Sequence, residues 1–163
     1  MRRNGWILSL LVVLFVLGNA NEVQGQSFTQ WAIDASASSE YGSDPWSAKQ
    51  MVGQPNVYPA YGDSPGAWAA AARDDGLQWV ALGFLEEVYV DYVEVYETFN
   101  PGAIVKVELV DTSGRNHIIW EGPGGLAGTT PRVSRFENVV VTVPCNGVRI
   151  TLDTESVPGW NEI

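Results

Sequence analysis

The sequence predicts an all-β fold, an antiparallel β-sandwich or barrel. Runs that alternate apolar with polar residues recur about every 8–15 residues, and clusters of turn residues separate them. Helical periodicity is almost absent, which argues against a helical bundle or an alternating α/β fold. Together these observations are typical of antiparallel sheets, in which one face of each strand is buried and the other meets solvent.

The expected elements follow one another along the chain. In order, they are a strand over 29–35, one or two helical turns over 46–52, and strands over 78–84, 88–98, 103–111, 117–120, 132–144 and 147–153. A turn at Asn100-Pro101-Gly102 separates the two central strands, because proline sets φ there and glycine supplies a positive φ. We interpret this turn as a structural reversal between adjacent strands, since its chemistry is complete without a ligand.

The two ends of the chain define the expected domain limits. Arg2 and Arg3 precede an apolar run over 6–17 and the small residues Gly18-Asn19-Ala20, the layout of a secretory signal peptide. Cleavage is expected after Ala20, with Gly25 as the next candidate, and an uncleaved N-terminal anchor is the alternative. The chain then divides into a signal peptide (1–20), a linker (21–28) and one sandwich domain (29–163).

The apolar and polar alternation over 157–163 begins a further strand and stops within it. We therefore expect a C-terminally incomplete sandwich, a fragment that lacks its last strand. The signal peptide predicts a secreted, periplasmic or cell-surface protein with no membrane contact after cleavage.

Charge narrows the classes of partner. The net charge is −10, and the seven basic and 19 acidic residues that follow Ala20 give −12. Such a surface repels nucleic acid and anionic lipid, and it fits neutral ligands or cations. Cys145 is the single cysteine, so no intrachain disulfide can form.

No constellation in the sequence predicts catalysis. Cys145 and His117 are the one thiol and the one imidazole, and the predicted elements do not bring them together as a nucleophile and its base. The acidic pairs Asp74-Asp75 and Glu86-Glu87 are neighbours whose side chains point apart, unlike the facing carboxyl groups of a glycosidase. We therefore expect no enzymatic activity.

Five segments resemble one known family. They are ASASSEYG (35–42), WSAKQMVGQPNVYPAYGDSPGAWA (46–69), QWVALGF (78–84), VEVYETFNPGAIVKVEL (93–109) and GWNEI (159–163). In content and order they resemble the discoidin-like domain, also called coagulation-factor C-type or galactose-binding-like. The version beside the F-box of a leucine-rich-repeat F-box protein, also found in bacterial secreted proteins, is the most similar. The resemblance implies a jelly-roll module without catalysis that binds carbohydrate, lipid or protein through loops at one end.

The long segment 53–73 carries the expected ligand site. Flat rings on loops suit the faces of sugars, and we assign Tyr58, Tyr61, Trp68 and Tyr41 as ligand-binding candidates. The resemblance makes Trp46, Trp68 and Trp79 structural as well, so packing of the loop against the sandwich is the alternative. The expected function is binding of carbohydrate, and the alternative is an extracellular adhesion or assembly module that binds protein and has no sugar site.

The resemblance also implies a structural calcium ion, Ca2+, because many domains of this fold hold one beside the loop that follows the first helical turn. The matching candidates are Gln54, Asn56, Asp63 and Glu162, all of which offer the oxygen ligands that hard cations prefer. Their loop is longer than in the calcium-binding members. The alternative is that Asn56 and Asp63 form turns and that Glu162 is a strand-edge charge or hydrogen-bond partner.

Overall fold

The computed structural model describes residues 28–163, so the predicted signal peptide and nearly all of the predicted linker lie outside the described part of the chain. Its elements are β1 (Asp34–Ala37), η1 (Ala48–Met51, a 3-10 helix), β2 (Leu77–Val88), β3 (Tyr92–Glu97), β4 (Ile104–Asp111), β5 (Asn116–Glu121), β6 (Arg132–Glu137) and β7 (Cys145–Asp153). Within residues 28–163, no helix has the length and hydropathy needed to cross a membrane.

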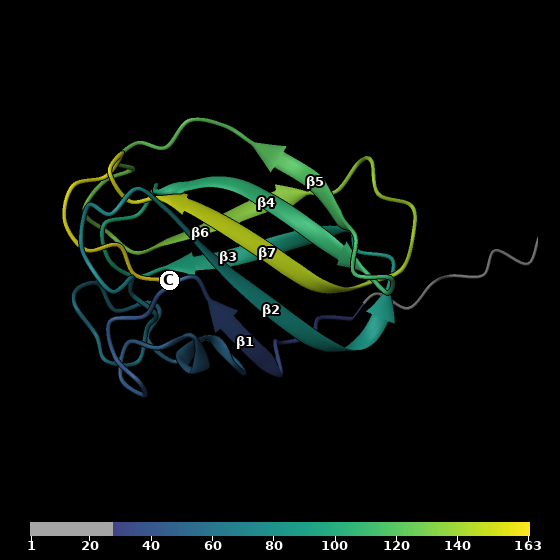
Figure 1. Ribbon diagram of the computed structural model, residues 1–163, viewed down its shortest axis with the longest axis horizontal. Coiled ribbons are helices and arrows are strands. Elements are labelled where there is room, and N and C mark those ends of the chain that lie inside the picture. The colour runs from purple at the N-terminus through teal and green to yellow at the C-terminus, as the bar shows by residue number, and fades with distance from the viewer. Residues whose placement is uncertain (1–27) are drawn as a thin grey trace, which may run out of the picture.

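The strands form two layers (Figure 1). A five-stranded sheet has the order β1-β2-β7-β4-β5, and a two-stranded sheet pairs β3 with β6 behind it. All of these pairings are antiparallel. The predicted all-β antiparallel sandwich is therefore confirmed.

The core lies between the two layers, and the central strands supply most of it. Val80, Val107, Leu109 and Leu152 on β2, β4 and β7 have no exposed surface, while Phe136 faces them from β6. Alternate residues of each strand point to the same face, which is why period-two patterning in the sequence located these strands. Burial of each such side chain contributes about 1.5–3 kcal/mol to folding.

The two strand boundaries that differ most from the prediction belong to β1 and β6. The first strand begins at Asp34 and not at residue 29, and the strand expected over 132–144 ends at Glu137. The second difference has a clear cause in Asn138. Its side-chain amide donates to the carbonyls of Val90 and Val141, and its oxygen accepts the Val140 and Val141 amides. This local turn competes with the ladder and terminates β6.

The corner at residues 100–102 was predicted to reverse the chain between adjacent strands, and this is wrong. It carries the chain from β3 in one sheet to β4 in the other. Asn100 and Gly102 both have positive φ, at 44° and 113°. The Glu97 carboxylate is 2% exposed and accepts the Gly102 N–H at 2.6 Å and the Ser134 hydroxyl of β6. The buried Glu97 carboxylate thus joins the corner to β6 of the two-stranded sheet, at the point where the chain crosses to the five-stranded sheet.

Asn100 also fastens the C-terminal segment to the corner. Its Nδ2 donates to the Trp160 carbonyl at 2.7 Å, and Asn161 Nδ2 donates to the Asn100 carbonyl at 3.1 Å. Backbone bonds continue this attachment, because Thr98 N–H donates to the Glu162 carbonyl and Glu162 N–H donates to that of Phe99. The corner therefore positions residues 160–162.

Two replacements of Asn100 should separate the contribution of its side-chain hydrogen bonds from that of its left-handed backbone conformation. We expect Asn100→Ala to lower the free energy of unfolding by about 2 kcal/mol, because it removes the side-chain hydrogen bonds with the Trp160 carbonyl and the Tyr61 hydroxyl and because alanine disfavours the left-handed conformation. Asn100→Gly keeps the conformation and should cost about 1 kcal/mol less than Asn100→Ala. Urea unfolding measures both, with exposed Asn116→Ala as the control. Equal stability of Asn100→Ala and the unmodified chain would contradict this role.

Candidate ligand-binding site

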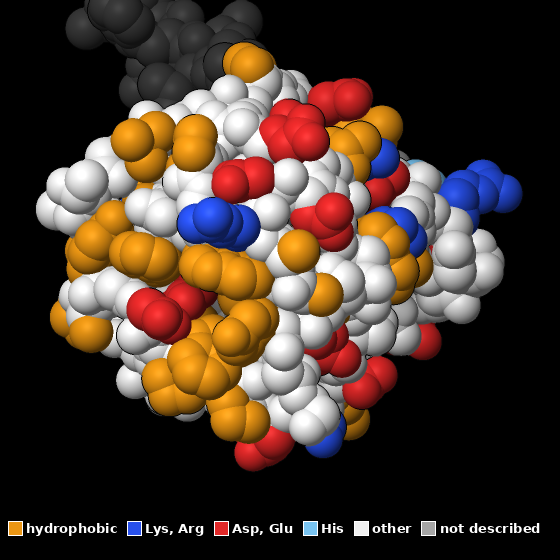
Figure 2. Space-filling view, turned by 60° about the vertical axis from the view of Figure 1, so that its left-hand side comes forward, with side chains coloured by type: hydrophobic (Ala, Val, Ile, Leu, Met, Phe, Trp, Pro, Cys, Tyr) orange, Lys and Arg blue, Asp and Glu red, His pale blue; other side chains and the backbone are white. Residues whose placement is uncertain are grey.

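A small pocket opens at the end of the sandwich where the C-terminal segment meets the loops that precede β2. It has a volume of about 110 Å³ and is lined by Tyr41, Trp46, Asp63, Ala69, Trp160 and Glu162. Figure 2 looks toward the loop end of the molecule and shows hydrophobic side chains gathered over part of this surface, with carboxylates among them. We call this group of six residues the aromatic pocket.

Three aromatic rings pack edge to face around the aromatic pocket. Tyr41 lies 5.5 Å from Trp46 at 86° and 5.0 Å from Trp160 at 72°, measured between ring centroids. Tyr41 is 56% exposed, and both tryptophans are half-buried. Edge-to-face contacts of this kind stabilise a fixed arrangement of rings while leaving part of their faces open to solvent.

Backbone and side-chain bonds hold the rings in place. Tyr41 N–H donates to the Ala69 carbonyl, and Ala69 N–H donates in turn to that of Trp46. Trp46 has φ of 56°, unusual for a residue other than glycine, and its indole N–H donates to Asp63 Oδ1 at 2.9 Å. Such strain persists only where the surroundings over-determine it, so the position of the Trp46 ring is set by the fold.

Two carboxyl groups meet at the aromatic pocket. Glu162 is 1% exposed, and its Oε2 accepts the Ser64 N–H at 3.0 Å. Burial, together with the hydrogen bond and charge of the adjacent Asp63, raises the pKa of Glu162 to about 7. Near neutral pH, this acid therefore exists both as a neutral hydrogen-bond donor and as a buried anion. The pocket can accept hydrogen bonds from hydroxyl or amine groups and can attract a cation.

The four residues predicted to bind ligand fall in different places. Tyr41 belongs to the aromatic pocket. Tyr58 packs on Tyr96 at 5.3 Å beside a separate cleft, and Tyr61 packs on Phe99 at 5.5 Å with its hydroxyl on Asn100.

Trp68 requires a correction. It has no exposed surface, and its indole N–H donates to the Ser39 carbonyl, so its ring cannot stack on a ligand. It instead anchors the long loop in the core.

Trp46 and Trp160 were not predicted as ligand residues. Trp160 lies two residues before Glu162 in an extended segment, a spacing that places two side chains on one side of the backbone. This spacing is the feature of the sequence from which the position of Trp160 beside Glu162 could have been predicted. The contribution of Trp46 depends on its left-handed backbone and on Asp63, neither of which leaves a pattern in the sequence.

The four predicted calcium ligands also divide into two groups. Asp63 and Glu162 meet in the aromatic pocket, whereas Gln54 and Asn56 line the separate cleft. Residues 28–163 contain no group of three or more His, Cys, Asp or Glu side chains that could hold a metal ion. A cation at the carboxyl pair would therefore need most of its oxygens from backbone carbonyls or water. Calcium binding stays a prediction.

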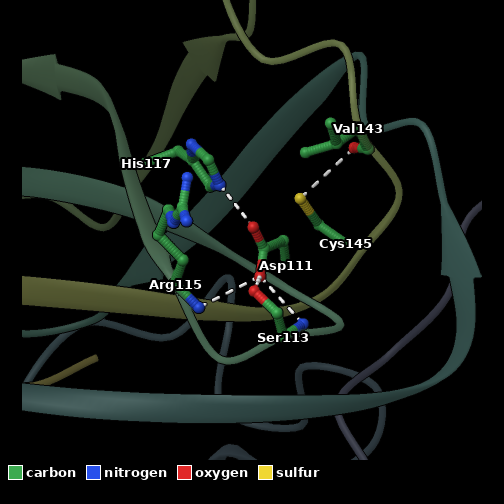
Figure 3. A network of polar contacts seen from close by, with 6 residues as sticks. All are labelled: Asp111, Ser113, Arg115, His117, Val143 and Cys145. Carbon is green, nitrogen blue, oxygen red and sulfur yellow. Dashed lines mark hydrogen bonds and ion pairs between the residues drawn. The ribbon is translucent and has the colours of Figure 1, made fainter.

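The thiol and the imidazole lie closer together than the sequence suggested, at the opposite end of the sandwich (Figure 3). Asp111 Oδ2 is 2.7 Å from His117 Nε2, and Asp111 is the register partner of Cys145. The Asp111 pKa lies well below its usual range because of the Ser113 hydroxyl and then His117. Burial raises the pKa of the Cys145 thiol, which is the reverse of what an activated nucleophile needs. The thiol's one hydrogen bond among the described residues goes to the Val143 carbonyl.

The sequence and the fold were compared with known proteins. Residues 20–121 match the family model of the pappalysin-1 SD scarf domain, C-terminal. No curated protein sequence matches the chain.

Several solved structures are similar in fold. Chitosan-binding module 1 from the chitosanase/glucanase of Paenibacillus sp. IK-5 is 15% identical, with a TM-score of 0.57 and coverage of 79% of this chain and 89% of the module. Reduced XRCC1, solved bound to the DNA pol beta catalytic domain, is 13% identical with a TM-score of 0.59, covering 83% of this chain and 94% of that one.

A GH29 fucosidase of Ruminococcus gnavus is 16% identical with a TM-score of 0.54, and the match covers 79% of this chain but only 23% of the fucosidase. At these identities the likeness establishes the fold alone, which is an antiparallel β-sandwich.

The raised pKa of Glu162 predicts a pH-dependent stability. The folded state favours the neutral acid, so this contribution is fully present below about pH 4.5 and is lost as pH rises to about 7. Glu162→Gln imitates the neutral acid and should remove this decline. At pH 8 the variant should be more stable than the unmodified chain by about 2 kcal/mol, with little difference at pH 4.5.

Denaturant unfolding from pH 4 to pH 9 measures the difference in the free energy of unfolding between Glu162→Gln and the unmodified chain. The contributions of the other titrating groups cancel in this difference because both proteins contain them. The matched control is Glu155→Gln at an exposed position, which should show no such trend. A difference between Glu162→Gln and the unmodified chain that stays constant with pH would contradict the assignment.

Proposed function

The chain belongs to the family of the pappalysin-1 SD scarf domain, C-terminal, and on this premise we propose that it is a non-catalytic binding module whose ligand is a carbohydrate. The observation that carries the proposal is the aromatic pocket, where three rings and two carboxyl groups converge on one loop end. Rings contact the apolar C–H faces of a sugar, while carboxyl oxygens accept hydrogen bonds from its hydroxyl or amine groups.

The size of the aromatic pocket fits a terminal or exposed sugar unit better than a buried ligand. A volume of about 110 Å³ is small beside the roughly 300–1,000 Å³ of pockets that enclose drug-sized molecules. The exposed Tyr41 ring at its rim adds a surface on which a sugar can stack. The chitosan-binding module of similar fold supports a carbohydrate ligand by analogy. The carboxyl groups of Asp63 and Glu162 in the aromatic pocket favour sugars that carry an amine.

We also propose that the module is of the discoidin-like type and acts outside the cytoplasm. The discoidin-like type rests on the order of the five segments from 35–42 to 159–163, and export rests on the charged and apolar pattern of residues 1–20.

A protein ligand is the second candidate function. The XRCC1 structure of similar fold was solved in complex with a protein, the DNA pol beta catalytic domain. In the present chain, an apolar cleft beside β3 offers a surface for such a partner.

The carbohydrate proposal predicts a specific pattern of losses on a glycan array that includes chitosan and chitin oligosaccharides. Tyr41→Ala and Trp160→Ala should each weaken binding at least tenfold, the equivalent of about 1.4 kcal/mol. Tyr89→Ala, at an exposed aromatic outside the pocket, is the matched control and should bind normally. Tyr58→Ala should also bind normally, because that ring packs against Tyr96.

Absence of binding to every glycan, with capture of a defined partner protein, would favour the second candidate. Hydrolysis of a polysaccharide by the purified chain would contradict both.

Calcium binding at Asp63 and Glu162 is a separate proposal. Millimolar calcium at pH 8 should raise the melting temperature of the unmodified chain, since a ligand that binds only the folded state stabilises it. Chelator should reverse the rise, and Asp63→Asn and Glu162→Gln should abolish it, whereas Glu155→Gln should retain it. A melting temperature that responds to neither calcium nor chelator would count against an ion at this site.

A further inference from the structure

The carboxyl groups of Asp63 and Glu162 have no basic partner. Of the six residues that line the aromatic pocket, these two are acidic and none is Lys, Arg or His. The ion pairs within residues 28–163 join other acids to Arg, Lys or His, and none includes either residue of this pair. Two close carboxylates without a counter-charge repel each other, and burial of Glu162 strengthens that repulsion. The arrangement favours a ligand that brings one positive charge.

Both carboxyl groups are held in place by the protein. Glu162 is 1% exposed, and its Oε2 accepts the Ser64 N–H at 3.0 Å. Asp63 Oδ1 accepts the Trp46 indole N–H at 2.9 Å. Within residues 28–163, no N–H or hydroxyl group donates a hydrogen bond to Glu162 Oε1 or Asp63 Oδ2. A carboxylate has about four acceptor positions and an ammonium has three donors, so these two oxygens can receive an ammonium group from a ligand.

Three aromatic rings line the pocket together with the carboxyl pair. They belong to Tyr41, Trp46 and Trp160. Aromatic faces attract cations, and cages of such rings recognise organic ammonium groups. A hard metal ion prefers six to eight oxygens, whereas only two side chains of this pocket carry carboxyl oxygens. The combination of three rings with two acids is therefore better suited to an ammonium group on a carbon skeleton.

On the basis of the carbohydrate function proposed above, on which this inference rests, we propose that the aromatic pocket selects an amino sugar with a free amine. Asp63 and Glu162 are the residues that determine this specificity. The ammonium group lies between the two carboxyl groups, and the ring of the sugar stacks on the exposed Tyr41 at the rim. The positive charge of the ligand then compensates the negative charge that the pocket holds.

Two close relatives of an amino sugar fit the pocket less well. N-Acetylation removes the positive charge and adds bulk to a group that must enter a pocket of about 110 Å³. A hydroxyl group in place of the amine is small enough, but it carries no charge and has one donor instead of three. Each would leave the buried Glu162 carboxylate without a counter-charge. Sites built around a polar group of the ligand strongly reject analogues that lack it.

Three matched sugars test the specificity. They are the methyl glycosides of glucosamine, N-acetylglucosamine and glucose, which differ in a single group on the ring. NMR titration of the purified chain at pH 7 gives the three dissociation constants, with chelator present so that no divalent cation competes for the carboxyl pair. We expect the glucosamine glycoside to bind at least tenfold tighter than either of the other two.

Variants of the carboxyl pair test whether these two residues set the preference. Glu162→Gln and Asp63→Asn keep the size of the side chain and remove its charge. Either should reduce the preference for the amine from at least tenfold to less than threefold. Glu155→Gln removes the same charge at an exposed position and should keep the full preference, which separates the pocket from general attraction to an acidic protein. The amide spectrum of each variant checks its folding, and loss of folding in one variant of the pair leaves the other as the test.

The possible outcomes distinguish this specificity from the carbohydrate function itself. Equal binding of the three glycosides would overturn the specificity and leave a carbohydrate-binding module, as would a preference that survives in both Glu162→Gln and Asp63→Asn. Failure of the glucosamine glycoside to bind at millimolar concentration, with glycans bound on the array, would also overturn the specificity alone. No binding of any glycoside or array glycan would overturn both proposals. Tighter binding of Nα-acetyl-lysine methylamide than of the glucosamine glycoside would replace the amino sugar by a lysine side chain of a partner protein.

Discussion

The pairing of Glu162 with Thr98 and Phe99 is the contact on which the loop end of this molecule depends. It joins the last described residues to the corner that carries the chain from the two-stranded sheet into the five-stranded sheet. Asn100 and Asn161 reinforce it with side-chain bonds to the facing backbone. Trp160 and Glu162 enter the aromatic pocket because the segment between them is held on both sides. Their positions follow from contacts between residues about 60 apart in the sequence.

Burial of Glu162 beside Asp63 defines the chemistry of the aromatic pocket. A charged carboxylate is costly to bury unless hydrogen-bond donors or a cation compensate for the loss of water. Here the hydrogen bond from the Ser64 amide compensates for only part of the lost hydration. The pKa of Glu162 therefore stays raised, at about 7. Donors on a sugar, an amine or a metal ion would each stabilise the anion. Burial of the Glu162 carboxylate destabilises the free protein, and for the same reason it favours ligands that donate hydrogen bonds or carry positive charge.

The aromatic pocket and the cleft beside β3 share the C-terminal segment. Glu162 lines the pocket and pairs with the end of β3, while Ile163 lines the cleft. The aromatic pocket and the cleft thus lie on either side of one short segment.

Local patterning by itself determined the class of fold and the approximate places of most strands. Alternation of apolar and polar residues reports which faces are buried, and that property is local. The helical turns expected over 46–52 contain the 3-10 helix Ala48–Met51, the aromatic content of the loops pointed to Tyr41, and the family resemblance pointed to Asp63 and Glu162. Only the tertiary structure decided that β3 and β4 lie in different sheets, that Trp68 is buried, that Gln54 and Asn56 lie apart from Asp63 and Glu162, and that Trp46 and Trp160 frame the pocket. These outcomes depend on non-local contacts, such as the buried Glu97 acceptor and the Asp63 bond to Trp46, for which no periodicity in the chain encodes the partner.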